Sequence, residues 1–172
     1  MLYPGPVPRA PRSLLEDGVF HVTSRGVAGG PLFCDETDRV VFLVELTRTA
    51  DAFLWTCHVY CLMTTHYHLL LETSREALSR GMQRLNGLYA QRFNARHRRR
   101  GHVFEQRFQA YAVESEDHFL AASEYILQNP VKAGLCEEAS EWPWSGGPLH
   151  AGAPPQGSVP RKGLSLTRAW PW

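Results

Sequence analysis

The stretch FLWTCHVYCLMTTHYHLLLE, residues 53–72, decides the fold class of this chain. Its first part, residues 53–63, is rich in β-branched and aromatic residues, and its last part, residues 66–72, is a short apolar run. Only Thr64 and Thr65 separate the two parts, which is typical of an antiparallel strand pair. We therefore expect two adjacent antiparallel strands at the centre of a sheet.

The second of these strands carries His66 and His68, with one residue between them. Side chains alternate across a strand, so both imidazoles project from one face while Tyr67 faces the other. Two histidines in this arrangement can bind one divalent cation and leave coordination positions open. The alternative is one hydrogen-bonded strand histidine and one surface histidine, so other residues must decide between the two.

The composition indicates one globular domain, because 172 residues with 44% hydrophobic content can bury a proper core. No apolar window approaches ~18 residues and no secretory leader is visible, so we expect a cytoplasmic protein without membrane contact. The four cysteines form no C-x-x-C pair. Cys57 and Cys61, on the first strand, are expected to point the same way as buried thiols.

The charge is unevenly distributed. Residues 75–107 contain nine arginines against Glu76 and Glu105, a net charge of +7, although the whole chain carries only +1. A basic segment on an otherwise acidic body is typical of a polyanion-binding surface, and the interleaved aromatic residues offer stacking surfaces for bases. A solvated arginine-rich turn is the alternative. The residues predicted to contact such a polyanion are Arg84, Arg92, Arg96, Arg98, Arg99, Arg100, His102 and Arg107.

The flanking sequence predicts further elements on both sides of the hairpin. Asp35 is the expected N-cap of a helix with Asp38 in its first turn, and Pro130 is expected to end a later helix. We expect strands at about 19–24 and 108–114 and helices after residue 35, at 76–97 and at 117–128. These elements form a domain over residues 18–147, between an N-terminal arm (1–17) and a flexible, Pro- and Gly-rich tail (148–172).

The helix at 117–128 supplies a second chemical clue. Tyr125 falls off its apolar stripe, and Asn129, four residues later, lies beside it, so a phenol and a carboxamide meet near the helix end. The alternative is a boundary tyrosine followed by an asparagine C-cap. Among the other tyrosines, Tyr111 is the one rival left open.

Five motifs occur in a specific order along the chain: HVTSRG (21–26), HYHLLLE (66–72), YAQRFNARHRRRGHVFEQRF (89–108), EYILQNPVKAGL (124–135) and WPWS (142–145). With these motifs the chain resembles the REP-associated tyrosine transposases, which belong to the single-tyrosine HUH transposases. The resemblance spans about residues 18–146. It implies an α+β fold with a ferredoxin-like antiparallel sheet flanked by helices.

The resemblance also implies a mechanism and a site. His66 and His68 look like the metal-binding pair, Asn129 like the third ligand and Tyr125 like the nucleophile, with Mg²⁺ or Mn²⁺ as the cofactor. The implied reaction nicks and rejoins single-stranded DNA through a 5′-phosphotyrosine intermediate, at hairpin-forming repeats. The expected partner is single-stranded or hairpin DNA, with the protein a monomer or a homodimer.

Two other functions remain open at this point. A non-catalytic, domesticated relative would bind hairpin DNA without forming a covalent adduct. A small zinc hydrolase would need a further histidine or acidic ligand near the pair, and neither His58 nor Glu72 is compelling in that role.

Overall fold

The computed structural model describes residues 17–147 and contains a five-stranded antiparallel sheet in the order β4-β1-β3-β2-β5. Apart from Asp17, the predicted arm and tail lie outside the described residues. The hairpin strand that carries the two histidines, β3, is the central strand, as its apolar sequence predicts. The strands are β1 (Gly18–Arg25), β2 (Thr56–Leu62), β3 (His66–Thr73), β4 (Gln109–Val113) and β5 (Ser145–Gly146).

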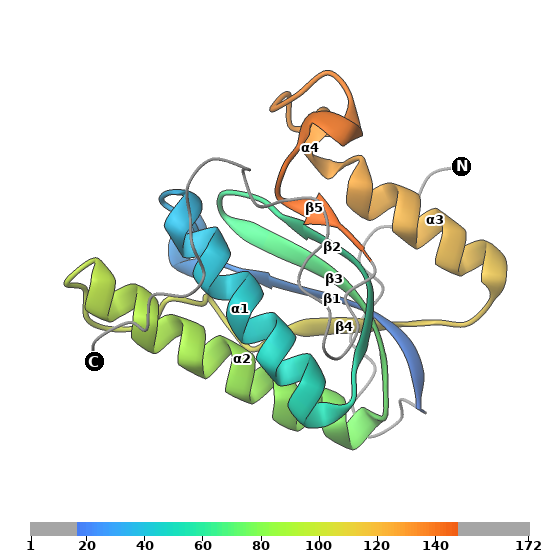
Figure 1. Cartoon of the computed structure of the whole chain (residues 1–172), viewed down its shortest axis with the longest axis horizontal. Helices are drawn as coiled ribbons and strands as arrows, with labels where there is room; N and C mark the ends of the chain where they lie inside the picture. Colours follow the sequence, from blue (N-terminus) through green and yellow to red (C-terminus); the bar gives the residue numbers. More distant parts are fainter. Residues whose placement is uncertain (1–16, 148–172) are drawn as a thin grey trace.

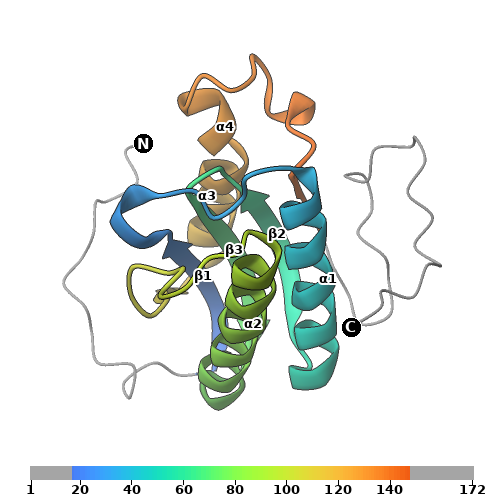
Figure 2. The ribbon, with the colours of Figure 1, turned by 90° about the vertical axis from the view of Figure 1, so that its left-hand side faces the viewer.

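Helices cover both faces of the sheet (Figures 1 and 2). The two long helices, α1 (Glu36–Phe53) and α2 (Arg75–Arg96), lie side by side on one face. The other face carries α3 (Glu116–Leu127), followed by the short α4 (Asn129–Lys132). Two short 3-10 turns, η2 (Val27–Gly29) and η3 (Ala139–Glu141), complete the described part. This arrangement confirms the predicted α+β class with an antiparallel sheet flanked by helices.

The two faces of the sheet bury cores of different size. The larger cluster, between the sheet and helices α1 and α2, contains the fully buried Tyr67, whose hydroxyl donates to Asn86 Oδ1 at 2.6 Å. Tyr67 therefore faces away from its two histidine neighbours, as strand alternation predicts. The smaller cluster lies under α3 and comprises Val59, Cys61, Met63, Leu70, Ala122 and Ile126.

Helix caps explain several boundaries and correct two predictions. Asp35 caps α1 by accepting from the backbone N–H of Asp38, as expected. However, α1 continues to Phe53 and is followed by the C-cap Leu54, which has a left-handed φ of 54°, so the strand expected from residue 53 begins at Thr56. Pro130 does not end a helix either: α3 stops at Leu127, and Pro130 lies in the first turn of α4, where its missing N–H costs nothing.

A β-bulge in β2 corrects the prediction for the cysteines. The pairing with β3 shifts register between Cys57 and Val59, which leaves His58 as an extra residue. Cys57 consequently belongs to the larger cluster and Cys61 to the smaller one, so the two thiols face opposite sides of the sheet. Both are buried, and burial raises the pKa of each to about 12.

No helix within residues 17–147 combines the length and the apolar character needed to cross a membrane.

Candidate functional site

The candidate site lies on the sheet face beneath α3, where β1 and β3 pair. Directly opposed residues of an antiparallel pair share a face. Thr23 opposes His68 and Arg25 opposes His66, while His21 opposes Leu70 on the same face. The sequence prediction missed this contribution of β1. The alternation His-x-Thr-x-Arg at residues 21–25 is the signal that places these three side chains with the histidine pair.

Three histidines form a contiguous group on this face. The rings of His66 and His68 are 5.1 Å apart between centroids, and His21 Nε2 lies 2.9 Å from His68 Nδ1. The other nitrogen of His68, Nε2, is buried and has no hydrogen-bond partner within the described residues. A buried nitrogen of this kind is a natural site for a cation, because buried polar atoms are otherwise satisfied.

Burial keeps these imidazoles neutral. It is the largest cause that lowers the pKa of His68 well below its usual value, followed by the neighbouring His21 and His66. Burial, with a contribution from His118, lowers the pKa of His21 to about 4. The pKa of His66 is lowered by burial and by Arg25. Neutral imidazole is the form that binds metal.

Helix α3 brings the predicted nucleophile to this group. Ala122 and Ile126 of α3 pack into the smaller core cluster, which turns the half-buried Tyr125 toward the histidines. Its ring centroid is 5.8 Å from that of His68, at an interplanar angle of 90°, and 5.9 Å from that of His21. The structure therefore places the phenol beside His68 and His21 without sealing it inside the core.

Two residues of α4 also contact Tyr125. Lys132 Nζ lies 4.7 Å from the Tyr125 ring centroid, a cation–π contact that holds positive charge next to the phenol. The Asn129 side chain donates from Nδ2 to the backbone carbonyls of Tyr125 (2.7 Å) and Ile126 (3.4 Å), so here it caps the helix end. Its amide oxygen is the atom that suits a hard divalent cation. The donor set of two neutral imidazoles and one amide oxygen fits such an ion, and within residues 17–147 the buried Nε2 of His68 has no other partner.

The predicted DNA-contacting arginines divide into two groups. The three on α2 bind partners within the chain and hold α2 against α1. Arg84 donates to Thr49 Oγ1 at 3.0 Å, and Arg92 lies 3.1 Å from the buried carboxylate of Glu45. Arg96 forms ion pairs of 2.6 Å with both Asp35 and Asp38.

The other five predicted contacts form an exposed basic loop between α2 and β4: Arg98, Arg99, Arg100, His102 and Arg107. The loop runs beside the end of β1. Val27 N donates to Val103 O at 3.0 Å and Glu105 N donates to Arg25 O at 3.0 Å. Because Arg25 opposes His66 across β1 and β3, the basic loop lies at the same end of the sheet as the histidine pair.

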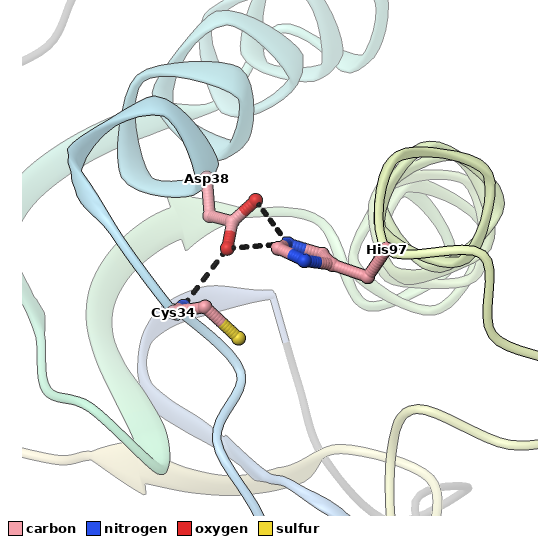
Figure 3. Close-up of side chains that lie close together, drawn as sticks. All are labelled: Cys34, Asp38 and His97. Atoms are coloured by element: carbon pink, nitrogen blue, oxygen red, sulfur yellow. Dashed lines mark hydrogen bonds and ion pairs between the residues drawn. The ribbon is translucent and has the colours of Figure 1, made fainter.

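A separate polar cluster joins the start of α1 to the end of α2 (Figure 3). Cys34, Asp38 and His97 place their potential ligand atoms within 4.8 Å of one another. The buried Asp38 carboxylate accepts from Cys34 N at 2.8 Å, and both of its oxygens lie 2.9 Å from His97 Nε2. Arg96 Nη1 already supplies a cation 2.6 Å from Asp38 Oδ1. We therefore interpret this cluster as an ion-pair brace between two helices rather than as a metal site.

The residues considered for a zinc hydrolase lie elsewhere. His58 Nε2 and Glu72 Oε2 pair with each other at 2.8 Å, and the His58 ring packs against Phe119. His21 is the further histidine that this alternative requires. His21 bonds to Nδ1 of His68, whereas the nitrogen without a partner within the described residues is Nε2. This position suits a residue that orients His68 better than a third metal ligand.

Comparison with known proteins identifies the class. A family model described as "Transposase IS200 like" matches residues 35–129, more than half of the chain and a span that includes the histidine pair, Tyr125 and Asn129. The chain belongs to this family of IS200-like transposases. No curated protein matched it.

One solved structure, described as that of a REP-associated tyrosine transposase bound to a REP hairpin, has a similar fold. The TM-score is 0.66, and the match covers 81% of this chain and 82% of that chain at 15% sequence identity. The resemblance expected from the motifs is thus confirmed by the family and by the shared fold.

Proposed function

We propose that this protein nicks and rejoins single-stranded DNA next to hairpin-forming repeats, with Tyr125 as the nucleophile. The observation that carries the proposal is the position of the Tyr125 ring, 5.8 Å from that of His68 and on the sheet face that also bears His66. Membership of the IS200-like transposases supports DNA cleavage as the reaction class. The hairpin substrate is proposed by analogy with the similar structure, which holds a REP hairpin.

We assign the metal ligands of the proposed site to His66, His68 and the amide oxygen of Asn129. A bound Mg²⁺ or Mn²⁺ would neutralise the charge that develops on the phosphate during cleavage. The neutral state of the two imidazoles and the unpartnered Nε2 of His68 support this assignment.

In the proposed reaction the phenolic oxygen of Tyr125 bonds to phosphorus as the phenol gives up its proton. The bond from phosphorus to the 3′ oxygen breaks, and that oxygen leaves as a hydroxyl, so the 5′ phosphate stays on the tyrosine. The 3′ hydroxyl of another strand then reverses the exchange and releases the phenol, which favours rejoining over hydrolysis. Lys132, above the tyrosine ring, provides positive charge beside the phosphate that Tyr125 would attack.

The exposed basic loop is the proposed DNA-contacting surface. Its arginines are available to phosphates, whereas Arg84, Arg92 and Arg96 are engaged between the helices. The loop and the histidine pair share one end of the sheet, so a strand bound by the loop would lie at the end of the sheet that carries the proposed metal ligands. Affinity from such contacts falls steeply with salt.

Covalent adduct formation tests the proposal. The purified chain is incubated with Mn²⁺ and a DNA hairpin that carries single-stranded flanks, and denaturing electrophoresis then separates protein–DNA adducts. We expect an adduct with the wild type and none with Tyr125→Phe. Tyr111→Phe is the matched control, because Tyr111 is the rival tyrosine and its hydroxyl bonds to Gln109 on β4.

Each outcome separates the alternatives. Hairpin binding by both variants, with adduct lost only in Tyr125→Phe, supports the proposal. An adduct that persists in Tyr125→Phe refutes the nucleophile assignment. Salt-sensitive hairpin binding without any adduct from the wild type supports the non-catalytic alternative.

A further inference from the structure

We infer that His21 is a positioning residue, which holds His68 with its proton on Nδ1 and so leaves the Nε2 lone pair for the cation. The inference rests on the proposed function, because it gives a role to a contact of one proposed ligand. His21 lies on β1, outside the segment that the family model matches.

The contact between the two rings is short and protected. His21 Nε2 and His68 Nδ1 are 2.9 Å apart, and the two residues are only 3% and 7% exposed. The histidines face each other diagonally across the β1–β3 pair, since His21 opposes Leu70 and His68 lies two residues before it. β1 is hydrogen-bonded to β3 on one side and to β4 on the other, which fixes the backbone of His21.

One proton is shared in this contact, and its position determines what His68 can bind. If His21 donates, the proton of His68 must reside on Nε2, which is then a buried N–H with no acceptor among the described residues and cannot bind metal. If His68 donates from Nδ1, its Nε2 carries a lone pair instead. An unsatisfied buried N–H is the costlier arrangement, so the hydrogen bond favours the second tautomer.

Metal-binding histidines are commonly oriented through their other ring nitrogen by a carboxylate or a carbonyl. Here a buried imidazole takes that place. Loss of such a partner typically weakens metal affinity about 10–100-fold.

Metal affinity and tautomer state can both be measured on the full chain without DNA. We expect isothermal titration with Mn²⁺ to show about 10–100-fold weaker binding in His21→Phe, which keeps a ring of similar size but offers no acceptor. His21→Gln places an amide oxygen near the position of Nε2 and should restore most of the affinity. His58→Phe is the matched control, because it makes the same change on the same sheet face and should leave the affinity unchanged.

Nitrogen-15 spectra of the metal-free histidines provide the readout that a purely structural role would not change. The wild type should show His68 protonated at Nδ1, and His21→Phe should lose this preference while remaining folded by circular dichroism. Protonation of His68 at Nε2 in the wild type would overturn the inference.

The variant His68→Ala separates this inference from the proposed function. If His68→Ala weakens Mn²⁺ binding while a folded His21→Phe binds like the wild type, only the role of His21 is overturned. If His68→Ala binds Mn²⁺ like the wild type, the proposed metal site itself is wrong, and the inference fails with it.

Discussion

Helix α2 packs against Trp55, two residues after the end of α1, and this contact leads to a stability prediction at Gly81. A Cβ at this position would lie 2.2 Å from Cζ2 of Trp55 and 2.9 Å from two more of its ring atoms. Ordinary carbon contacts are about 3.5–4.0 Å. Trp55 is only 2% exposed, so its indole is enclosed by close-packed neighbours. In Gly81→Ala the helix must therefore shift away from the sheet or the indole must leave its site.

The expected magnitude combines two opposing terms. Overpacking a close-packed site costs about 1–3 kcal/mol, and the severe overlap indicates the upper part of that range. Replacing a mid-helix glycine by alanine returns about 0.5–1 kcal/mol. We expect Gly81→Ala to lower the free energy of unfolding by about 1–2 kcal/mol. Gly87 lies on the same helix, and no atom of residues 17–147 would lie within 4 Å of a Cβ there, so Gly87→Ala should raise stability by about 0.5–1 kcal/mol.

Urea unfolding, followed by tryptophan fluorescence and circular dichroism, measures both variants. The difference of about 2–3 kcal/mol between them is the decisive quantity, because helix propensity contributes equally to each and cancels. If Gly81→Ala proves as stable as Gly87→Ala, Trp55 does not restrain this face of α2 and the packing argument is wrong.

Two further predictions concern arginines and thiols. Arg92→Ala should lower stability by about 1–2 kcal/mol, because it removes a partner of the buried Glu45. Arg100→Ala should leave stability unchanged but weaken hairpin binding and reduce the salt slope of the binding constant by about 0.7–0.9. Unfolding curves measure the first effect and fluorescence anisotropy at several salt concentrations measures the second; a stability loss in Arg100→Ala with unchanged stability in Arg92→Ala would contradict the assignment. Burial raises the pKa of Cys57 and Cys61 to about 12, whereas an unfolded thiol titrates at about pH 8.5. Above about pH 8.5 the unfolded chain therefore loses these protons and the folded chain keeps them, so the free energy of unfolding should fall by up to about 1.4 kcal/mol per pH unit per thiol until the pH nears 12. The variant with both Cys57→Ala and Cys61→Ala should lack this decrease when the free energy of unfolding is measured by urea titration at about pH 8–11.

Local rules predicted the parts of the fold that depend on neighbouring residues. The apolar run of residues 66–72 places β3 at the sheet centre, and alternation alone puts Tyr67 in the core opposite His66 and His68. The N-cap at Asp35 follows from its acidic side chain before an apolar periodic segment. These features depend on residues that are close in the sequence, so a single sequence is enough to predict them.

Features that depend on strand register could not be read from the sequence. The bulge at His58 reverses the facing of Cys57 relative to Cys61, and no local signal distinguishes it from a regular strand. The contact of His21 with His68 requires knowledge of which strand pairs with β3 and in which register.

The arginine-rich segment shows the same limit for charge. Net charge identifies a basic region but does not tell which guanidinium groups are already neutralised. Arg92 and Arg96 meet carboxylates of α1 that lie more than 40 positions earlier in the chain, a distance that no helical periodicity encodes. The exposed loop that follows keeps its charge available.

The brace formed by Asp38, Arg96 and His97 has a consequence for the loop that starts at Arg98. The brace holds His97, the residue before the loop, against the buried Asp38 in the first turn of α1. At the other end of the loop, Glu105 N donates to Arg25 O of β1. A segment tied at both ends has fewer conformations to lose when a ligand arrives. The backbone that carries its arginines is thus preorganised, and part of the entropic penalty of ordering the loop has been met during folding, before any nucleic acid is encountered.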